Sequence, residues 1–269
     1  MNLRSQFGRI RNHFLTSMYR RPAALGDLGP IVTFTFDDFP RSALTVGGSI
    51  LESFAVRATY YVSMGLMNAE NPLGQQFSRE DLDSLVERGH EAAIHGFDHL
   101  SARDTSVERF IADVSRCETM LHQLFPAGAS SNFAYPFGHT TLSLKRRLGP
   151  KMSSSRGAIA GLNGPEIDLN LLRANLLCGD VDQFEPVRQL MSENAARNSW
   201  LIFFSHDVEN EPSAYGCTPA LLRQTVRFAV EQGASVLTVA DAVRALSPPE
   251  YVRGELQGKR DSISVQRPG

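Results

Sequence analysis

The sequence lacks the features that mark several specialised protein classes. It has only three cysteines, Cys117, Cys178 and Cys217, and their wide spacing fits neither a disulfide framework nor a zinc finger. No apolar run reaches the roughly 18 residues that a transmembrane helix needs, and the N-terminus has no apolar segment typical of a signal peptide. We therefore expect reduced cysteines and a cytoplasmic location.

An excess of charge of one sign is also missing. The net charge is −2 and the isoelectric point is near 6.4, so the strong basic excess of most nucleic-acid-binding domains is absent. What the chain does have is the composition of an ordinary globular protein, with 42% hydrophobic and 21% charged residues. Its 269 residues suit a single α/β barrel with a substantial core.

Residues 1–30 form a basic N-terminal segment. Residues 1–26 contain five arginines and no acidic residue. Four apolar residues recur at the spacing of one helix face, namely Phe7, Ile10, Phe14 and Met18. The interpretation we favour is a helix packed on the body of the fold or in a homodimer contact. The alternative is that residues 1–26 contact an anionic membrane or a lipid-linked substrate.

Strand and helix patterns alternate through residues 31–246. The expected strands are 31–36, 57–63, 91–95, 131–136, 151–157, 169–177, 200–206 and 234–240, and the expected helices are 44–54, 78–89, 107–124 and 218–233. In the second helix Ser78 and Asp81 form a capping box and Gly89 ends the helix. This alternation predicts parallel strands closed into a barrel within one domain. Residues 247–269 lack periodicity and are expected to be a loosely ordered tail.

Residues that are unusual for a strand end stand where four of the expected strands end. They are Asp37 and Asp38, His95 and His99 in "HGFDH", Tyr135 to Gly138 in "YPFG", and His206. In a β/α barrel the carboxyl ends of all strands meet at one face, where catalytic residues come from several strands. We therefore expect these residues to converge although they are far apart in the sequence.

One carboxylate and two imidazoles suit a divalent transition metal such as zinc. Asp38, His95 and His99 supply that set, which leaves Asp37 free to act as a base. Each motif alone also has an ordinary explanation. Paired acids often cap helices, and two histidines four residues apart often share one helix face. The order of all the motifs, each at a strand end, favours a metal site.

The order of motifs resembles the polysaccharide deacetylase family, also described as NodB-like domains or carbohydrate esterase family 4. The resemblance covers residues 31–245 and rests on "TFDD", "HGFDH", "FAYPFG" and "FFSHD". It implies a distorted (β/α) barrel of about seven parallel strands. It also implies Asp37 as general base, and Asp38, His95 and His99 as ligands of a divalent metal, Zn²⁺ before Co²⁺, Ni²⁺ or Mn²⁺.

The remaining motifs imply roles for other residues. By the resemblance, His206 is the general acid, and a backbone N–H near Phe137 faces the oxyanion. Tyr135, Pro136 and Phe204 join the oxyanion and substrate-binding set. Phe204 stands where the family often has Leu, so the pocket for the acyl group is expected to have a different shape.

Three departures from the family pattern affect this assignment. Phe39 follows the first motif where Gly is usual, and Ala134 replaces an arginine that would hold the catalytic carboxylate. Arg173, in "LLRANLL", is a candidate for that catalytic position, and simple surface pairing is its alternative. The fourth motif is not clear, and "CGDVDQF" offers Asp180 or Asp182 to orient His206.

The sequence thus predicts a metal-dependent hydrolase that removes an N-acyl group, foremost acetyl, from an amino sugar. Its carbohydrate substrate is an oligosaccharide, a polysaccharide or a lipid-linked precursor. Three alternatives remain: hydrolysis of another C–N bond in a formyl-amino sugar or cyclic amide, a non-haem iron oxygenase, and a non-catalytic carbohydrate-binding protein. The acid that precedes both histidines and has an acidic neighbour favours hydrolysis over oxygenation. Rim loops at 65–76 and 208–217 are expected to select the sugar.

Overall fold

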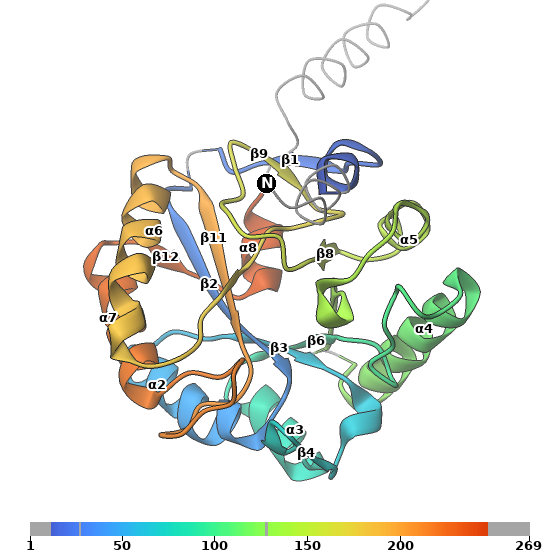
Figure 1. The fold of residues 1–269 in the computed structure, drawn as a ribbon, viewed down its shortest axis with the longest axis horizontal. Helices are drawn as coiled ribbons and strands as arrows, with labels where there is room; N and C mark the ends of the chain where they lie inside the picture. Colours follow the sequence, from blue (N-terminus) through green and yellow to red (C-terminus); the bar gives the residue numbers. More distant parts are fainter. Residues whose placement is uncertain (1–11, 27, 127–128, 247–269) are drawn as a thin grey trace, which may run out of the picture.

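The computed structural model describes residues 12–26, 28–126 and 129–246. Its centre is one parallel sheet that curls into a distorted half-barrel (Figure 1). In spatial order its strands are β10 (Asn175–Leu176), β11 (Trp200–Ser205), β2 (Ile31–Asp38), β3 (Thr59–Val62), β6 (Glu91–Ile94), β7 (Ala129–Ala134) and β8 (Ser154–Arg156). Neighbours in this order pair in parallel. The predicted single-domain barrel of about seven parallel strands is confirmed.

Two additional contacts bring the ends of this sheet closer to a closed barrel. An isolated parallel bridge joins Arg156, at the end of β8, to Leu172, which precedes β10. A short strand, β12 (Ser235–Val236), pairs with the first two residues of β2. Of the expected strand 234–240 only Ser235 and Val236 are extended in β12, and its last two residues are helical because Thr238 caps α8 by accepting the N–H of Asp241.

Helices cover the outside of the sheet (Figure 1). They are η1 (Ala43–Gly48), α2 (Ser49–Glu52), α3 (Arg79–Glu87), α4 (Val107–Leu124), α5 (Leu142–Leu148), α6 (Phe184–Ala196), α7 (Pro219–Glu231) and α8 (Val239–Ala245), with short 3-10 turns η2 (Met64–Leu66), η3 (Pro136–Gly138) and η4 (Val181–Gln183). The capping box of Ser78 and Asp81 is present as predicted. The sequence analysis missed α5, α6 and α8. It also predicted a longer strand at 169–177 than the two residues of β10.

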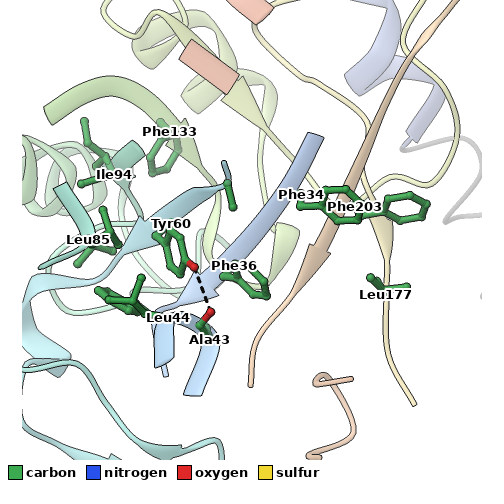
Figure 2. Packing of buried hydrophobic residues seen from close by; sticks show 14 of the residues in the cluster. Phe34, Phe36, Ala43, Leu44, Tyr60, Leu85, Ile94, Phe133, Leu177 and Phe203 are labelled. Atoms are coloured by element: carbon green, nitrogen blue, oxygen red, sulfur yellow. Dashed lines mark hydrogen bonds between the residues drawn. The ribbon is translucent and has the colours of Figure 1, made fainter. Parts of the chain in front are cut away.

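The main core lies between the sheet and the helices (Figure 2). Phe34 of β2 and Phe203 of β11 stack with their ring centroids 5.8 Å apart. The Tyr60 hydroxyl donates to the carbonyl of Ala43 at 3.0 Å, which ties η1 to β3. Burial of each such side chain contributes about 1.5–3 kcal/mol, so this layer fixes the positions of the strand ends.

A second, smaller core fills the inside of the barrel. Trp200 starts β11, is fully buried, and donates its indole N–H to the Thr33 hydroxyl at 2.9 Å. On the inner faces of β6 and β7 the corresponding residues are the small Ala93 and Ala134. Small side chains at this level leave space for a larger group from a neighbouring strand.

The described part of the N-terminal segment packs on the body of the fold. Residues 12–17 are helical, and β1 (Pro22–Ala24) pairs antiparallel with β9 (Glu166–Asp168). Leu15 is buried, and its carbonyl accepts a hydrogen bond from the buried Lys145 ammonium at 2.6 Å. The segment therefore docks through Leu15 and β1.

The predicted apolar face of this segment does not make that contact. Phe14 and Met18 are 51% and 40% exposed, and Phe7 and Ile10 lie outside the described residues. Contact with a membrane and formation of a homodimer both stay predictions. In the parts of the chain that the structure describes, no helix combines the length and apolar character needed to span a membrane.

Candidate active site

Seven of the ten predicted site residues meet in one cavity of about 570 Å³ at the carboxyl ends of the strands. Its lining includes Asp37, Asp38, His95, His99, Phe137, Phe204 and His206. A hairpin that the sequence analysis missed, β4 (Glu70–Asn71) with β5 (Gly74–Gln75), supplies part of the rim. The convergence follows from the parallel topology, which places all these strand ends at one face.

The backbone at the end of β2 explains how two adjacent acids reach the same cavity. Successive side chains of a regular strand point to opposite faces. Here Asp38 has φ of +65° and Phe39 has φ of +71°, so the regular alternation stops after Asp37. A positive φ is unusual for residues other than glycine, which fits the glycine usual after the first motif in the family. Phe39 is held by stacking on Phe77, with ring centroids 5.1 Å apart.

Asp38, His95 and His99 form a cluster suited to a cation. One ligand atom from each lies within 4.8 Å of the others. Asp38 Oδ1 is 3.1 Å from His99 Nε2 and 3.6 Å from His95 Nε2. This buried oxygen nevertheless has no hydrogen-bond partner among the described residues. A buried carboxylate oxygen without a partner is costly, and a bound cation would satisfy it.

The protonation states also fit a metal site. The Nδ1–H of His95 donates to the carbonyl of Ala134 at 2.9 Å, which leaves the Nε2 lone pair facing the cluster. Burial lowers the pKa of His95 to about 3 and also lowers the pKa of His99. Both imidazoles are therefore neutral ligands at physiological pH. Burial raises the pKa of Asp38 to about 6, a cost that a bound cation would offset.

Asp113 of α4 holds the loop between the two histidines in place. Its carboxylate accepts the backbone N–H groups of Phe97 and Asp98, both at 2.9 Å. Gly96 has φ of +82°, and a Cβ there would lie 2.7 Å from Asp113 Oδ2, so only glycine fits. The loop thus positions His99. The sequence analysis missed Asp113, although an acid on the buried face of an amphipathic helix was a usable signal.

Asp37 pairs with Arg156 inside the barrel. The Arg156 guanidinium donates from Nη2 to Asp37 Oδ1 at 2.5 Å, and Arg156 is only 1% exposed. Burial alone would raise the pKa of Asp37. The charge of Arg156, together with its hydrogen bond, leads the effects that outweigh it, so the pKa of Asp37 is lowered. Asp37 is therefore an ionised carboxylate, as a general base must be.

Arg173 does not take the position that the sequence analysis suggested for it. Its guanidinium donates to the carbonyl of Ala160, and Arg156 occupies the place beside Asp37. Arg156 is the cross-strand partner of Ala134 in the β7–β8 register. The arginine that is missing from the third motif is therefore supplied by the neighbouring strand. An arginine at the end of the otherwise small-residue strand "SSSRG" was the signal available in the sequence.

The third motif contributes Phe137 and Gly138 to the cavity. Phe137 has φ of +58°, and its exposed ring packs on His99 with centroids 4.5 Å apart. Tyr135 and Pro136 are buried and do not line the cavity, so their predicted contact with substrate is not found. Burial raises the pKa of Tyr135 to about 12, and its ring packs in the core against Phe133.

His206 follows β11 and contacts the loop behind it. Its Nδ1 lies 3.4 Å from the carbonyl oxygen of Tyr215, so the tautomer with a proton on Nδ1 leaves Nε2 for the substrate. The expected orienting acids do not reach it. Asp180 accepts from the Thr218 hydroxyl and the Val181 N–H, and Asp182 pairs with a neighbouring glutamine.

Residues 27–150 match the family model described as polysaccharide deacetylase. Over this part the chain is similar to the polysaccharide deacetylase family. The match contains three of the four motifs on which the resemblance was based, so the resemblance is confirmed. Among proteins of curated function, none matches this chain significantly.

Solved deacetylase structures share the fold. A Mycobacterium smegmatis protein classed as a polysaccharide deacetylase has 16% identity and a TM-score of 0.56, over 88% of this chain and 96% of that one. A mutant of the Bacillus subtilis peptidoglycan deacetylase has 14% identity and a TM-score of 0.52, over 87% of this chain and 97% of that one. The Colletotrichum lindemuthianum chitin deacetylase has 18% identity and a TM-score of 0.52, over 80% of this chain and 88% of that one. At these identities the likeness concerns the fold.

Proposed function

We propose that this polysaccharide deacetylase homologue is a metal-dependent hydrolase that removes an N-acyl group, foremost acetyl, from an amino sugar. The substrate is an oligosaccharide, a polysaccharide or a lipid-linked precursor. The observation that carries the proposal is the pairing of two different carboxylates in one cavity. Asp38 faces two neutral histidines, and Asp37 beside it is held ionised by Arg156.

Asp38, His95 and His99 would hold the divalent metal, for which Zn²⁺ is the first candidate and Co²⁺, Ni²⁺ and Mn²⁺ are others with suitable ligand preferences. When bound, such an ion polarises the amide carbonyl and lowers the pKa of a water molecule. One carboxylate and two imidazoles leave positions open for both water and substrate. The partnerless oxygen of Asp38 supports this assignment.

Asp37 takes the proton of the attacking water. Its lowered pKa keeps it ionised at neutral pH, and Arg156 fixes its orientation through the 2.5 Å contact. A positioned base of this kind typically contributes about 10²–10⁴ in rate. The same pairing favours hydrolysis over an oxygenase, because an oxygenase triad has no use for a second, arginine-held carboxylate.

The backbone N–H of Phe137 would stabilise the oxyanion that forms at the amide carbon. The N–H groups of the next two residues, Gly138 and His139, already donate to the carbonyls of Tyr135 and Pro136. The positive φ of Phe137 sets the local backbone direction. A donor fixed before the reaction stabilises developing charge without reorganisation.

His206 would protonate the leaving amine. It lines the same cavity, and the positive charge of its protonated form acts on both Asp37 and Asp38. The Tyr215 carbonyl accepts from its Nδ1–H, which directs Nε2 toward the substrate. An amine leaves poorly without a proton, so the reaction needs an acid at this point.

Metal-dependent acetate release tests the proposal. The full-length protein is stripped with a chelator, reloaded with Zn²⁺, and incubated with N-acetylglucosamine oligomers and with simple N-acetyl amino-sugar glycosides. We expect release of acetate and free amine in equal amounts, lost on stripping and restored by metal. If the metal-loaded protein hydrolyses none of these substrates, nor their formyl analogues, the proposed function is wrong.

A further inference from the structure

Most of the cavity wall beyond the catalytic groups is apolar. Besides the five proposed catalytic and metal-binding side chains, the apolar lining consists of Pro72, Leu73, Phe137, Gly138, Ala158, Leu176 and Phe204. Phe137 and Leu176 are 59% and 38% exposed, and Tyr215 opposite His206 is 55% exposed. Three of the nine exposed large hydrophobic residues in the described ranges thus gather at one cavity, which indicates a binding surface.

Hydrogen-bonding side chains are few on the same wall. Outside the proposed catalytic and ligand groups they are Asn71, His139 and Tyr215, and no described residue of the lining is Lys, Arg or Glu. Asn71 Oδ1 already accepts from the Leu73 N–H and the Gln76 amide, and His139 Nδ1 contacts Ser101 at 3.2 Å. A run of sugar residues would bring many hydroxyl groups to this wall, and hydroxyls buried without partners cost free energy.

The apolar surface lies directly beside the reacting groups. Leu176 and Phe204 are cross-strand neighbours on β10 and β11. The Phe204 ring is 6.4 Å from the ring of His206, the proposed acid. A group that extends from the scissile amide therefore meets these two side chains first.

The cavity is also bounded on one side by two loops that approach each other. The hairpin of β4 and β5 meets the loop after His206, since a Cβ on Gly74 would lie 3.7 Å from Glu209 Oε1. A volume of about 570 Å³ is that of a pocket for one small ligand. It suits one amino sugar with a substituent better than an extended chain.

We propose that the substrate carries an apolar chain or ring next to the scissile amide, and that Leu73, Leu176 and Phe204 bind it. This inference rests on the proposed hydrolase function. The apolar group has two chemical sources, a long N-acyl chain or an apolar aglycone on the sugar. Aromatic rings such as Phe137 also pack on sugar faces, but the aliphatic Leu73 and Leu176 favour a hydrocarbon.

Two substrate series test the inference and separate the sources. In one, the methyl glycoside of glucosamine carries N-acyl groups of two, four, six and eight carbons. In the other, the N-acetyl group is kept and the aglycone is methyl, butyl or octyl. The Zn²⁺-loaded full-length protein is assayed for free amine, with chitotetraose as the polysaccharide-like reference.

We expect kcat/KM to rise about three- to fourfold for each buried methylene in one of the two series. The series that rises identifies the source of the apolar group. If the protein hydrolyses these compounds and neither series rises, or if chitotetraose is a better substrate than every amphiphile, the inference is overturned.

A matched pair of variants ties the preference to the cavity. Leu176→Gln should reduce the octyl-to-methyl or the eight-to-two-carbon ratio of kcat/KM at least tenfold. Val230→Gln is the control, because Val230 is similarly exposed on α7 but does not line the cavity. It should leave the ratio as in the wild type. Equal changes in the two variants would contradict the assignment.

Binding separates this inference from the proposed function. Asp37→Asn removes the proposed base, so dissociation constants of the amphiphilic and methyl substrates can be measured by calorimetry without turnover. Tighter binding of the apolar compounds supports the inference even if the wild type hydrolyses none of them, in which case only the proposed reaction fails. Equal dissociation constants would refute the inference.

Discussion

Arg156 and Asp37 form an ion pair inside the barrel, with Nη2 and Oδ1 2.5 Å apart, and come from strands 119 residues apart in the sequence. Ala134 is the register partner of Arg156 on the neighbouring strand, and the Arg156 guanidinium lies 4.8 Å from the Tyr61 ring centroid. The pair holds the proposed base ionised and fixes its direction. The neighbouring carboxylate, Asp38, remains available as a ligand of the proposed metal.

Removal of this arginine should shift the pH dependence of the reaction. Without the charge of Arg156, burial dominates and the pKa of Asp37 rises. The base must be deprotonated to act, so the acidic limb of the kcat/KM profile should move to higher pH in Arg156→Ala. The matched control Arg173→Ala should keep the wild-type profile.

A relocated arginine distinguishes this role from a structural one. Loss of one partner from a buried ion pair also destabilises a protein by about 3–5 kcal/mol, so thermal unfolding is measured in parallel. The double variant Ala134→Arg with Arg156→Ala should recover part of the shift, because the two positions are register partners. An unshifted profile in a folded Arg156→Ala variant would refute the role.

His206→Ala should harm amide hydrolysis more than ester hydrolysis. A phenoxide leaves readily without protonation, whereas an amine does not. We expect a loss of about 10²–10⁴ on an N-acetyl amino sugar and a clearly smaller loss on 4-nitrophenyl acetate. Rates on both substrates are compared at equal metal content. Equal losses on the two substrates would argue against His206 as the general acid.

Asp113→Ala should weaken metal binding without touching a ligand. The two 2.9 Å hydrogen bonds to the loop between the histidines would be lost, and His99 would be less firmly placed. Changes to groups that orient ligands typically cost about 10–100-fold in metal affinity. Competitive titration with a chromophoric chelator measures the effect, and Glu118→Ala on the same helix is the control. An unchanged dissociation constant would show that the loop holds its shape without Asp113.

The metal-free protein should lose stability in mild acid, in part because of His90. Its Nδ1 accepts the Ala58 N–H at 3.1 Å and its Nε2–H donates to Glu52 at 2.9 Å, so the ring is neutral. Burial lowers the pKa of His90 to about 4. Between pH 6.5 and 4 the unfolded chain therefore binds a proton that the folded chain does not, and stability falls as pH falls.

The size of this effect is about 1.5 kcal/mol between pH 6.5 and pH 5. Urea unfolding in the presence of a chelator measures it. His90→Gln should show a flatter dependence over this interval, and the control His122→Gln should follow the wild type. If His90→Gln is as pH-dependent as the wild type, the neutral buried histidine is not the cause.

The strand-end residues could be predicted because the barrel topology alone brings them together. Asp38, His95, His99 and His206 each follow a recognisable strand, and parallel strands share their carboxyl ends. Arg156 could not be assigned in this way, since its partner is distant in sequence and its strand, Ser154–Arg156, is only three residues long. Its place depends on contacts with Asp37, Tyr61 and Phe204, which come together only in the packed barrel.

The remaining misses have similar causes. Strand β10 and both strands of the β4–β5 hairpin are only two residues long. Such short strands show no alternation of polar and apolar residues by which the sequence could predict them. The expected strand at 234–240 ends early because the cap at Thr238 starts a helix. The apolar wall around Leu176 likewise joins residues from separate short elements, and only the folded chain shows that they share one cavity.

The most direct test of the account is the division of roles between the two adjacent aspartates. Asp37→Asn and Asp38→Ala are purified alike, loaded with Zn²⁺ and dialysed, and metal content and acetate release are measured on the same samples. We predict that Asp37→Asn retains one metal per chain and loses about 10²–10⁴ in rate. We predict that Asp38→Ala retains neither metal nor activity. Full metal in Asp38→Ala, or loss of metal from Asp37→Asn, would contradict the assignment.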